Sequence, residues 1–289
     1  MTFDDDARID SSKVKRRRRT IGVGAAGGGG LLVIGLFVLS QVLGVDLTGL
    51  APQTGGGGAE EADSLQNCET GADANASIDC RLAGAADSLS GYWSTEAQTL
   101  GITDYVDPQF FLFDDATSTG CGQATSAVGP FYCPPDTSIY VDTAFYDDLR
   151  GRYGASGGPL AEMYVAAHEW GHHIQNLTGV LARAQDGDTG PDSNGVRVEL
   201  QADCYAGAWV AAASEAAGTY GEPLLDEVTD AQIADALSAA AAVGDDRIQG
   251  TTANSESWTH GSSDQRQKWF TQGLNGGPAA CDTFAVATP

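Results

Sequence analysis

A His-Glu-x-x-His pattern at residues 168–172 is the feature that most restricts what this chain can form. On a helix, residues four apart lie on one face about one turn apart, so the imidazoles of His168 and His172 can reach one metal ion. Glu169 then points about 100° around the axis, beside the ion and not at it. A carboxylate there can take a proton from metal-bound water. The pattern predicts a helix that carries a metal site, with Glu169 as general base.

The residues around this pattern are those of a helix. Pro159 suits the first turn because the N–H it lacks has no partner there, and Glu162 favours the positive end of the helix dipole. Gly179 can adopt the left-handed conformation that ends a helix. An apolar stripe at helical spacing runs opposite the two histidines: Met163, Trp170, Ile174 and Leu177. One face of this helix is therefore predicted for the core and another for the metal.

A zinc site that catalyses hydrolysis has three protein ligands and one open position, so a third ligand must come from elsewhere. Glu199 and Asp203 lie one turn apart in a segment of small residues that predicts a second helix. One carboxylate can bind the metal while the other accepts the N–H of a ligating imidazole. We predict Glu199 as the third ligand and Asp203 as the acceptor; the alternative is that both are ordinary solvated acids.

The two remaining histidines have different predicted roles. His173 is turned about 100° from His172, which favours a structural position. His260 lies in a loop before a segment that predicts a helix containing Trp269 and Phe270. Hydrolysis develops negative charge on the carbonyl oxygen, and an imidazole on such a loop can donate to that oxygen. The alternative for His260 is a capping or buried structural histidine.

Several stretches together resemble the neutral zinc metallopeptidase family of membrane-anchored bacterial proteins: residues 168–175, Glu199 with Asp203, residues 244–249 and residues 259–266. The resemblance covers roughly residues 65–285. The order of the motifs, His-Glu-x-x-His followed by Glu-x-x-x-Asp, is also similar to that of the gluzincins. It implies zinc as cofactor, a zincin-like fold and these site residues in the roles given above: His168, His172, Glu199, Glu169, Asp203 and His260. The 26 residues between the second histidine and the third ligand exceed the gluzincin interval.

A further acid is a candidate to orient His260. A helix rich in alanine is predicted to begin near Asp230 and to end at Gly244, and Asp246 follows it. Carboxylates commonly hold imidazoles around zinc sites, so we predict that Asp246 orients His260. The alternative is a solvated acid after the helix cap.

The fold class predicted is α+β: a zincin-like metallopeptidase domain with a small antiparallel sheet and an active-site helix pair. Residues 109–113 and 138–142 predict short strands and residues 85–100 a helix, and from residue 144 onward the pattern is helical apart from two loops. The stretch 131–141 fits two arrangements. It can be an edge strand across the cleft, to which an extended peptide adds by backbone hydrogen bonds, or an interior strand.

The N-terminal part predicts a membrane anchor. Seven of the fifteen basic residues lie within residues 1–20, directly before an uncharged stretch at 21–45. That stretch can cross about 30 Å of hydrocarbon, and the basic residues before it favour a cytoplasmic N-terminus. We predict a cytoplasmic tail (1–20), one transmembrane helix (21–45), a flexible linker (46–67) and an extracellular domain (68–289) at the cell membrane. The alternative is a long cleaved signal peptide.

The net charge of −24 bears on partners. Beyond residue 20 the chain holds eight basic and thirty-five acidic residues. A surface this negative repels nucleic acid, so we predict no nucleic-acid partner. The simplest explanation is an acidic coat that keeps an exported domain soluble.

The cysteines are confined to the predicted extracellular domain. All six lie beyond residue 67, at positions 68, 80, 121, 133, 204 and 281. An even number in an exported domain predicts disulfides, for which fifteen connectivities exist. We predict the sequential pairing, because its first two pairs close short local loops. A thiolate metal site is the competing interpretation, but no Cys-x-x-Cys is present.

The function predicted is that of a zinc-dependent metalloendopeptidase with a peptide or protein substrate. Glu169 acts as general base and His260 donates to the oxyanion. Two alternatives stay open. One is a surface binding module that keeps the scaffold without catalysis, and the other is a zinc hydrolase of non-peptide bonds, because activated water does not specify the bond it attacks.

Overall fold

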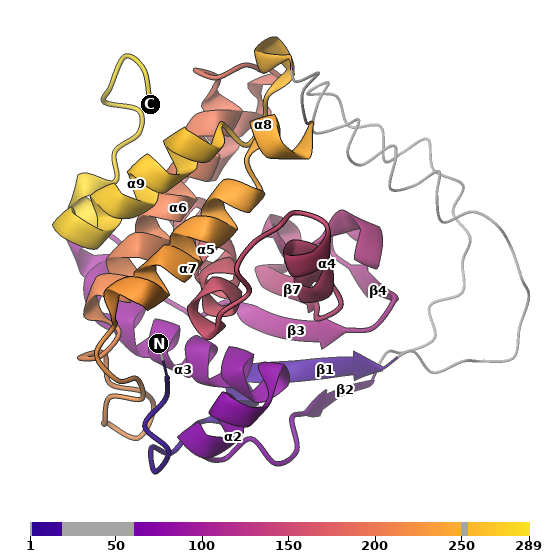
Figure 1. Ribbon diagram of the computed structural model, residues 1–289, viewed down its shortest axis with the longest axis vertical. Helices are drawn as coiled ribbons and strands as arrows, with labels where there is room; N and C mark the ends of the chain where they lie inside the picture. The colour runs from indigo at the N-terminus through magenta and orange to yellow at the C-terminus, as the bar shows by residue number, and fades with distance from the viewer. Residues whose placement is uncertain (1, 19–60, 250–253) are drawn as a thin grey trace, which may run out of the picture.

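The computed structural model describes residues 2–18, 61–249 and 254–289, which form one mixed sheet and a group of helices beside it (Figure 1). The sheet has the strand order β2-β1-β3-β7-β6. Its strands are β1 (Val14–Arg18), β2 (Glu61–Ser64), β3 (Gln109–Phe113), β6 (Phe131–Cys133) and β7 (Ser138–Asp142). The two strands predicted at 109–113 and 138–142 are confirmed.

The predicted antiparallel sheet is wrong, because the sheet is mixed. β3 pairs in parallel with both β1 and β7, and only β2 and β6 pair antiparallel with their neighbours. Between β3 and β7 the chain forms a separate hairpin, β4 (Ala116–Thr119) with β5 (Gly122–Thr125), and then β6. This long connection returns the chain to the end of the sheet where β3 began, so β7 runs in the same direction as β3.

Alternating side chains of β3 enter two different cores. Phe110 and Leu112 point into the main core with the helices, whereas Phe111 and Phe113 join a smaller cluster with Tyr140. This is the two-residue period of a strand with both faces covered, and it explains why residues 110–113 form an uninterrupted apolar run.

Helix α5 lies between the sheet and the other long helices. It contacts β6 and β7 as well as α3, α6 and α7. The helices of the described chain are α2 (Gly71–Ala76), α3 (Ile78–Glu96), α4 (Phe145–Gly151), α5 (Pro159–Leu177), α6 (Asn194–Ala212), α7 (Asp230–Ala242), α8 (Asp245–Ile248) and α9 (Ser263–Gly276). A side chain at Gly207 or Gly273 would clash with the backbone of the facing helix, so glycine at both positions lets α6 and α9 pack closely.

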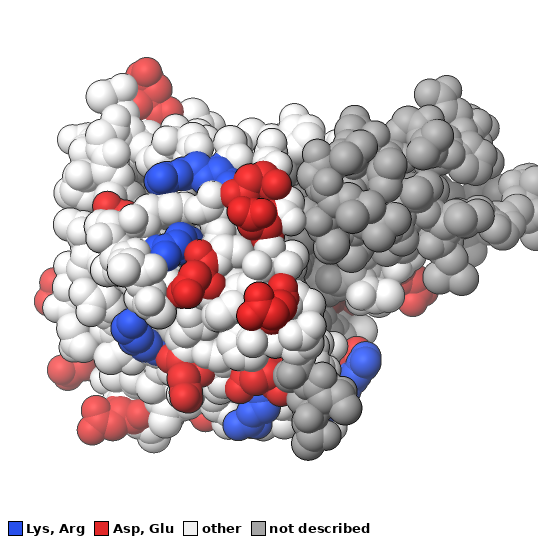
Figure 2. All heavy atoms as spheres, turned by 90° about the horizontal axis from the view of Figure 1, so that it is seen from above, with Lys and Arg blue, Asp and Glu red and all other residues white. Residues whose placement is uncertain are grey.

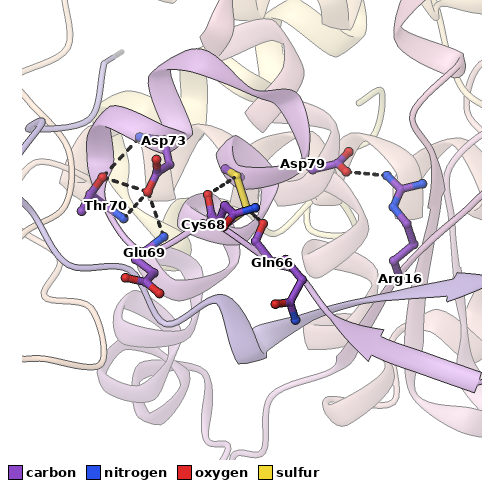
Figure 3. The surroundings of a disulfide bond; sticks show 9 residues. Arg16, Gln66, Cys68, Glu69, Thr70, Asp73 and Asp79 are labelled. Carbon is purple, nitrogen blue, oxygen red and sulfur yellow. Dashed lines mark hydrogen bonds and ion pairs between the residues drawn. A yellow bond between two sulfur atoms is a disulfide. The ribbon is translucent and has the colours of Figure 1, made fainter.

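Residues 2–18 are part of the folded domain. β1 lies inside the sheet, and Phe3 and Val14 are buried in the main core. Arg16 of β1 forms an ion pair with Asp79 of α3, with Nη2 and Oδ2 2.6 Å apart, beside the Cys68–Cys80 disulfide (Figure 3). The N-terminal segment therefore belongs to the same structural unit as the rest of the chain.

This placement corrects the predicted membrane topology. A cytoplasmic tail and an extracellular domain cannot share one sheet, so the predicted localisation is wrong, as is the predicted linker end at residue 67, because β2 begins at Glu61. The transmembrane helix predicted at 21–45 falls outside the described residues. Within residues 2–18, 61–249 and 254–289, no helix has the length and apolar character needed to cross a membrane.

The predicted disulfide pairing is confirmed. Cys68 is bonded to Cys80, Cys121 to Cys133 and Cys204 to Cys281. The second bond joins the turn of the β4-β5 hairpin to β6, and the third joins α6 to the C-terminal segment. Each closed loop stabilises the fold by about 3–4 kcal/mol in the chain-entropy model.

Candidate metal centre

Helix α5 places His168 and His172 on one face, as predicted from their spacing. The helix begins with Pro159 in its first turn, and Gly179 follows its end with a φ of +74°. The two imidazole ring centres are 4.8 Å apart. Neither ring is freely solvated, because the side chains of His168 and His172 are only 8% and 12% exposed.

Helix α6 brings Glu199 to the same two imidazoles. Its Oε2 lies 3.2 Å from Nε2 of His168, and its Oε1 lies 3.5 Å from Nε2 of His172. Zinc bonds of about 2.0–2.2 Å in a tetrahedron place neighbouring ligand atoms about 3.3–3.6 Å apart. These are the only three metal-binding side chains that converge in this way within the part of the chain that the structure describes.

A buried carboxylate fixes the tautomer of His168. Nδ1 of His168 lies 2.9 Å from Oδ1 of Asp203, which is fully buried on α6. A carboxylate can only accept, so Nδ1 carries a proton and Nε2 is the nitrogen that faces Glu199 and can bind a metal once it is deprotonated. Arg266 of α9 donates two hydrogen bonds to Asp203, from Nε to Oδ2 at 2.8 Å and from Nη2 to Oδ1 at 2.9 Å. Tyr164 also donates its hydroxyl proton to Oδ1. Asp203 thus takes the position predicted for it.

A buried amide fixes the tautomer of His172 in the same way. Nδ1 of His172 lies 2.8 Å from Oε1 of Gln175. The amide nitrogen of Gln175 donates to the carbonyl of Val198 at 2.6 Å and to Oε1 of Gln201 at 3.1 Å, so the amide oxygen must face the imidazole. Nδ1 of His172 therefore carries a proton, and Nε2 is the nitrogen that faces Glu199.

The donor set fits a divalent cation. Two imidazole Nε2 atoms and a carboxylate face one another, and this group is stabilised by positive charge, either as protons on Nε2 or as a cation that replaces them. Burial lowers the pKa of His168, but the charge and hydrogen bond of Asp203 and the hydrogen bond of Glu199 outweigh it and raise that pKa to about 10. Burial raises the pKa of Glu199, yet His172 and His168 bring it well below its usual range. Both shifts show that these groups together stabilise positive charge.

Glu169 lies beside this group on α5 and is 7% exposed. Burial raises its pKa, and the charge of Glu199 adds to that effect, while His172 and His168 act in the opposite direction. The net direction is upward, so this carboxylate binds a proton more strongly than a solvated glutamate does. A stronger proton acceptor next to the ligands is what general base catalysis requires.

His260 is oriented by Asp245, not by Asp246 as predicted. Nδ1 of His260 lies 3.2 Å from Oδ1 of Asp245. Oδ2 of Asp245 accepts the backbone N–H groups of Thr259, His260 and Gly261 at 2.7–3.0 Å and so fixes the loop itself. The side chain of His260 is 47% exposed, which leaves Nε2 available to a substrate.

Asp246 has a different role. Its Oδ1 accepts from the backbone N–H and the hydroxyl of Ser263 at 2.7 and 2.9 Å, at the first residue of α9. The carboxylate therefore satisfies a free N–H group at the helix start. Asp246 positions α9, and through α9 the Arg266 side chain, but it does not contact His260.

Sequence reasoning missed three functional positions: Gln175, Asp245 and Arg266. All three stand in the stretches on which the family resemblance is based, so their presence was visible. No spacing rule shows which polar side chain turns inward, because the partners lie far away in the chain: Arg266 is 63 residues from Asp203, and Gln175 is 23 from Val198.

Arg266 offers a test of how the ligands are held. We expect Arg266→Lys to weaken zinc binding about tenfold, because an ammonium cannot make the two parallel bonds that fix Asp203. Tyr164→Phe, which removes one donor from the same carboxylate and no charge, is the matched control and should have a smaller effect. Competition against a chromophoric chelator measures both. Equal zinc affinities of Arg266→Lys and the unmodified chain would show that the two parallel bonds from Arg266 to Asp203 do not contribute to zinc binding.

Two histidines and a glutamate, with a second buried glutamate beside them, match the ligand set and base that zinc-dependent hydrolases use. A family model described as "Putative neutral zinc metallopeptidase" matches residues 4–284, and the chain belongs to this family. The resemblance found in the sequence is confirmed. The match begins at residue 4 and not near 65, in agreement with the place of β1 in the sheet.

Relatives of the chain occur in distant bacteria. An uncharacterized protein of Mycobacterium tuberculosis (strain ATCC 25618 / H37Rv) is 52% identical over 228 residues, which cover 77% of this chain and 76% of that protein. The uncharacterized protein YpfJ of Escherichia coli (strain K12) is 34% identical over 297 residues, which cover 96% of this chain and 97% of that protein. No solved structure matches the chain.

Proposed function

We propose that this chain is a zinc-dependent endopeptidase. The observation that carries the proposal is the convergence of His168, His172 and Glu199, with both imidazoles held by buried partners and Glu169 one residue from the first ligand. The three side chains hold the metal and leave the fourth position for water or substrate. The domain has the helix pair and edge strand expected of a zincin-like fold, which we include in the proposal.

The residues divide the work of peptide hydrolysis. Zinc, when bound, lowers the pKa of a water and polarises the substrate carbonyl. Glu169 accepts the proton of the attacking water and passes it to the departing amine. His260 donates from its solvent-accessible imidazole to the oxyanion as it develops. Asp245 stabilises the cationic form of His260: burial lowers the pKa of that imidazole, but the hydrogen bond and charge of Asp245 raise it overall, with help from Glu199.

The edge of the sheet offers a place for the peptide chain. Among the residues that the structure describes, β6 is the last strand on one side of the sheet, pairs with β7 alone, and contacts α5. An exposed strand edge presents unpaired backbone groups, to which an extended peptide can add. Of the two arrangements considered for residues 131–141, β6 has the edge position and β7 is interior.

Peptide or protein is the substrate class that we propose, and nucleic acid is not. On the face shown in Figure 2, acidic and basic side chains are interspersed and form no continuous basic surface. The net charge of −24 repels a polyanion. A non-catalytic binding module is disfavoured because the base and all three ligands are chemically competent residues.

Zinc content and chelator sensitivity test the proposal directly. We expect one zinc per chain in the purified protein, hydrolysis within a mixed peptide library, complete loss on treatment with 1,10-phenanthroline, and recovery on adding zinc. A chain that binds zinc but cleaves no peptide, while hydrolysing ester or amide model compounds, would identify a hydrolase of other bonds. A zinc-free active enzyme would contradict the proposal altogether.

A further inference from the structure

His173 lies next to a proposed zinc ligand but belongs to a separate hydrogen-bond network. It is 2% exposed and is not one of the three converging ligands. Its Nε2 lies 2.7 Å from the carbonyl oxygen of Val106, and its Nδ1 lies 3.0 Å from the hydroxyl of Tyr132. The imidazole thus touches two segments that approach α5 from outside: the loop before β3 and the edge strand β6.

For a neutral imidazole, the proton positions of this network follow from the acceptor at Nε2. A carbonyl oxygen only accepts, so Nε2 of His173 carries the proton and Nδ1 has the lone pair. Tyr132 must then donate its hydroxyl proton to Nδ1. The Tyr132 oxygen in turn accepts from the amide nitrogen of Asn176 at 3.0 Å, one turn further along α5. Each donor has one acceptor, so the neutral imidazole is fixed at both nitrogens.

The loop that contains Val106 is fixed by hydrogen bonds to three other side chains. Tyr105 accepts from the indole nitrogen of Trp170 at 2.9 Å. Asp107 pairs with Lys13 at 2.8 Å and accepts from Ser90 at 2.6 Å. The loop is therefore a fixed support, and His173 connects it through α5 to β6.

β6 is held to the sheet and to the β4-β5 hairpin by the Cys121–Cys133 disulfide and by the stacking of Phe131 on Tyr140. It has three residues, pairs with β7 on one side only, and is the sheet edge nearest to α5. Tyr132 is its central residue, 8% exposed, with its ring 5.5 Å from the imidazole centre. The hydrogen bonds of the Tyr132 hydroxyl with His173 and Asn176 connect β6 directly to the metal-bearing helix.

We propose that His173 is a positioning residue that sets the edge strand β6 at a fixed distance from the metal ligands, so that a peptide paired with β6 presents its carbonyl to the metal. This inference rests on the proposed function. The imidazole does so through Tyr132, and it touches neither metal nor substrate. Loss of the contact affects the binding of long ligands, while ligands that reach only the metal bind as before.

Two substitutions separate the two nitrogens of His173. The Oδ1 atom of asparagine stands near the position of Nδ1 and can accept from Tyr132, whereas the Nε2 atom of glutamine stands near the position of the imidazole Nε2 and can donate to Val106. His173→Asn therefore keeps the connection to β6, and His173→Gln keeps only the connection to the loop. Tyr132→Phe removes the same contact from the other partner, together with the hydrogen bond that Asn176 donates to the Tyr132 oxygen.

The test compares two zinc-directed probes on the zinc-loaded full chain. Acetohydroxamate reaches only the metal, and a tripeptide hydroxamate also extends along the strand. We expect His173→Gln and Tyr132→Phe to weaken the tripeptide probe about tenfold, the effect of one buried hydrogen bond, and to leave acetohydroxamate unchanged. His173→Asn should retain most of the tripeptide affinity. Parallel loss of both probes, or a glutamine variant as tight as the unmodified chain, would overturn the proposal.

Amide hydrogen exchange of residues 131–133 gives a second readout that needs neither zinc nor activity. We expect about tenfold faster exchange in His173→Gln and Tyr132→Phe and near-normal protection in His173→Asn. Unchanged exchange in all variants would show that β6 is held by other contacts and would contradict the role of His173. A chain that binds no zinc would instead refute the proposed function, while the exchange rates would still decide whether His173 holds the strand.

Discussion

Glu169→Gln is expected to lower kcat for peptide hydrolysis by roughly 10²- to 10⁴-fold while one zinc per chain stays bound. The amide has nearly the same shape as the carboxylate, so the packing around this 7% exposed side chain is preserved. It cannot accept the proton of the attacking water. None of the three proposed ligands is changed, and the zinc affinity should therefore stay within a few-fold. Steady-state kinetics and metal analysis on the same preparation measure both quantities.

Two further variants test whether the effect of Glu169→Gln is specific to the proposed general base. Glu227→Gln makes the same change at an exposed position away from the site and should leave both kcat and zinc content unaltered. Glu199→Gln removes a proposed ligand and should lose zinc as well as activity, because an amide oxygen is a weaker donor than a carboxylate. If Glu169→Gln retained full activity, another group would have to serve as the base, and the mechanism proposed above would be wrong.

The helix that carries the histidines could be predicted because its information is local. Pro159, the 168–172 spacing and Gly179 lie within one segment, and α5 begins and ends where they indicate. The same holds for residues 109–113 and 138–142, which are short apolar runs bounded by turn residues. Their directions in the sheet could not be predicted, because pairing partners depend on connections that bring distant segments together.

The choice between Asp245 and Asp246 shows that the contact of a single side chain also could not be predicted from the sequence. Both acids follow Gly244, and both were available to orient His260 by sequence position. Neighbouring residues at the start of a short helix point in directions about 100° apart, so one faces the loop at 259–261 and the other faces Ser263. The rotation of this short helix about its axis decides which acid contacts the imidazole, and no sequence signal specifies that rotation.

The N-terminal segment was misread for a similar reason. Its basic residues are typical of a segment that precedes a membrane span. Three of them instead have partners in the domain: Lys13 pairs with Asp107, Arg16 with Asp79 and Asp114, and Arg17 lies over the ring of Phe111. In a chain with so many acidic residues, a basic strand finds acidic partners in its own domain.

Removal of residues 1–60, which include β1, is therefore expected to prevent folding of the remaining domain. The segment buries Phe3, Ile9 and Val14, each at 4% exposure or less. Each such side chain contributes about 1.5–3 kcal/mol, and the sum is comparable to the roughly 5–15 kcal/mol stability of a whole domain. The deletion also leaves β3 as a bare, apolar sheet edge, which favours aggregation. We expect a chain of residues 61–289 to be insoluble or to lack a cooperative thermal transition.

The matched control keeps β1 and removes only residues 19–60. Arg18 of β1 pairs with Glu61 of β2 in an antiparallel register, so a two-residue Asn-Gly turn can join them directly. A chain of residues 2–18, Asn-Gly and 61–289 should be soluble, unfold cooperatively and bind zinc. Val14→Asp in this chain places a charge in the core and should behave like the deletion. A stable, zinc-binding 61–289 chain would contradict this prediction, because it would show that the domain folds without β1.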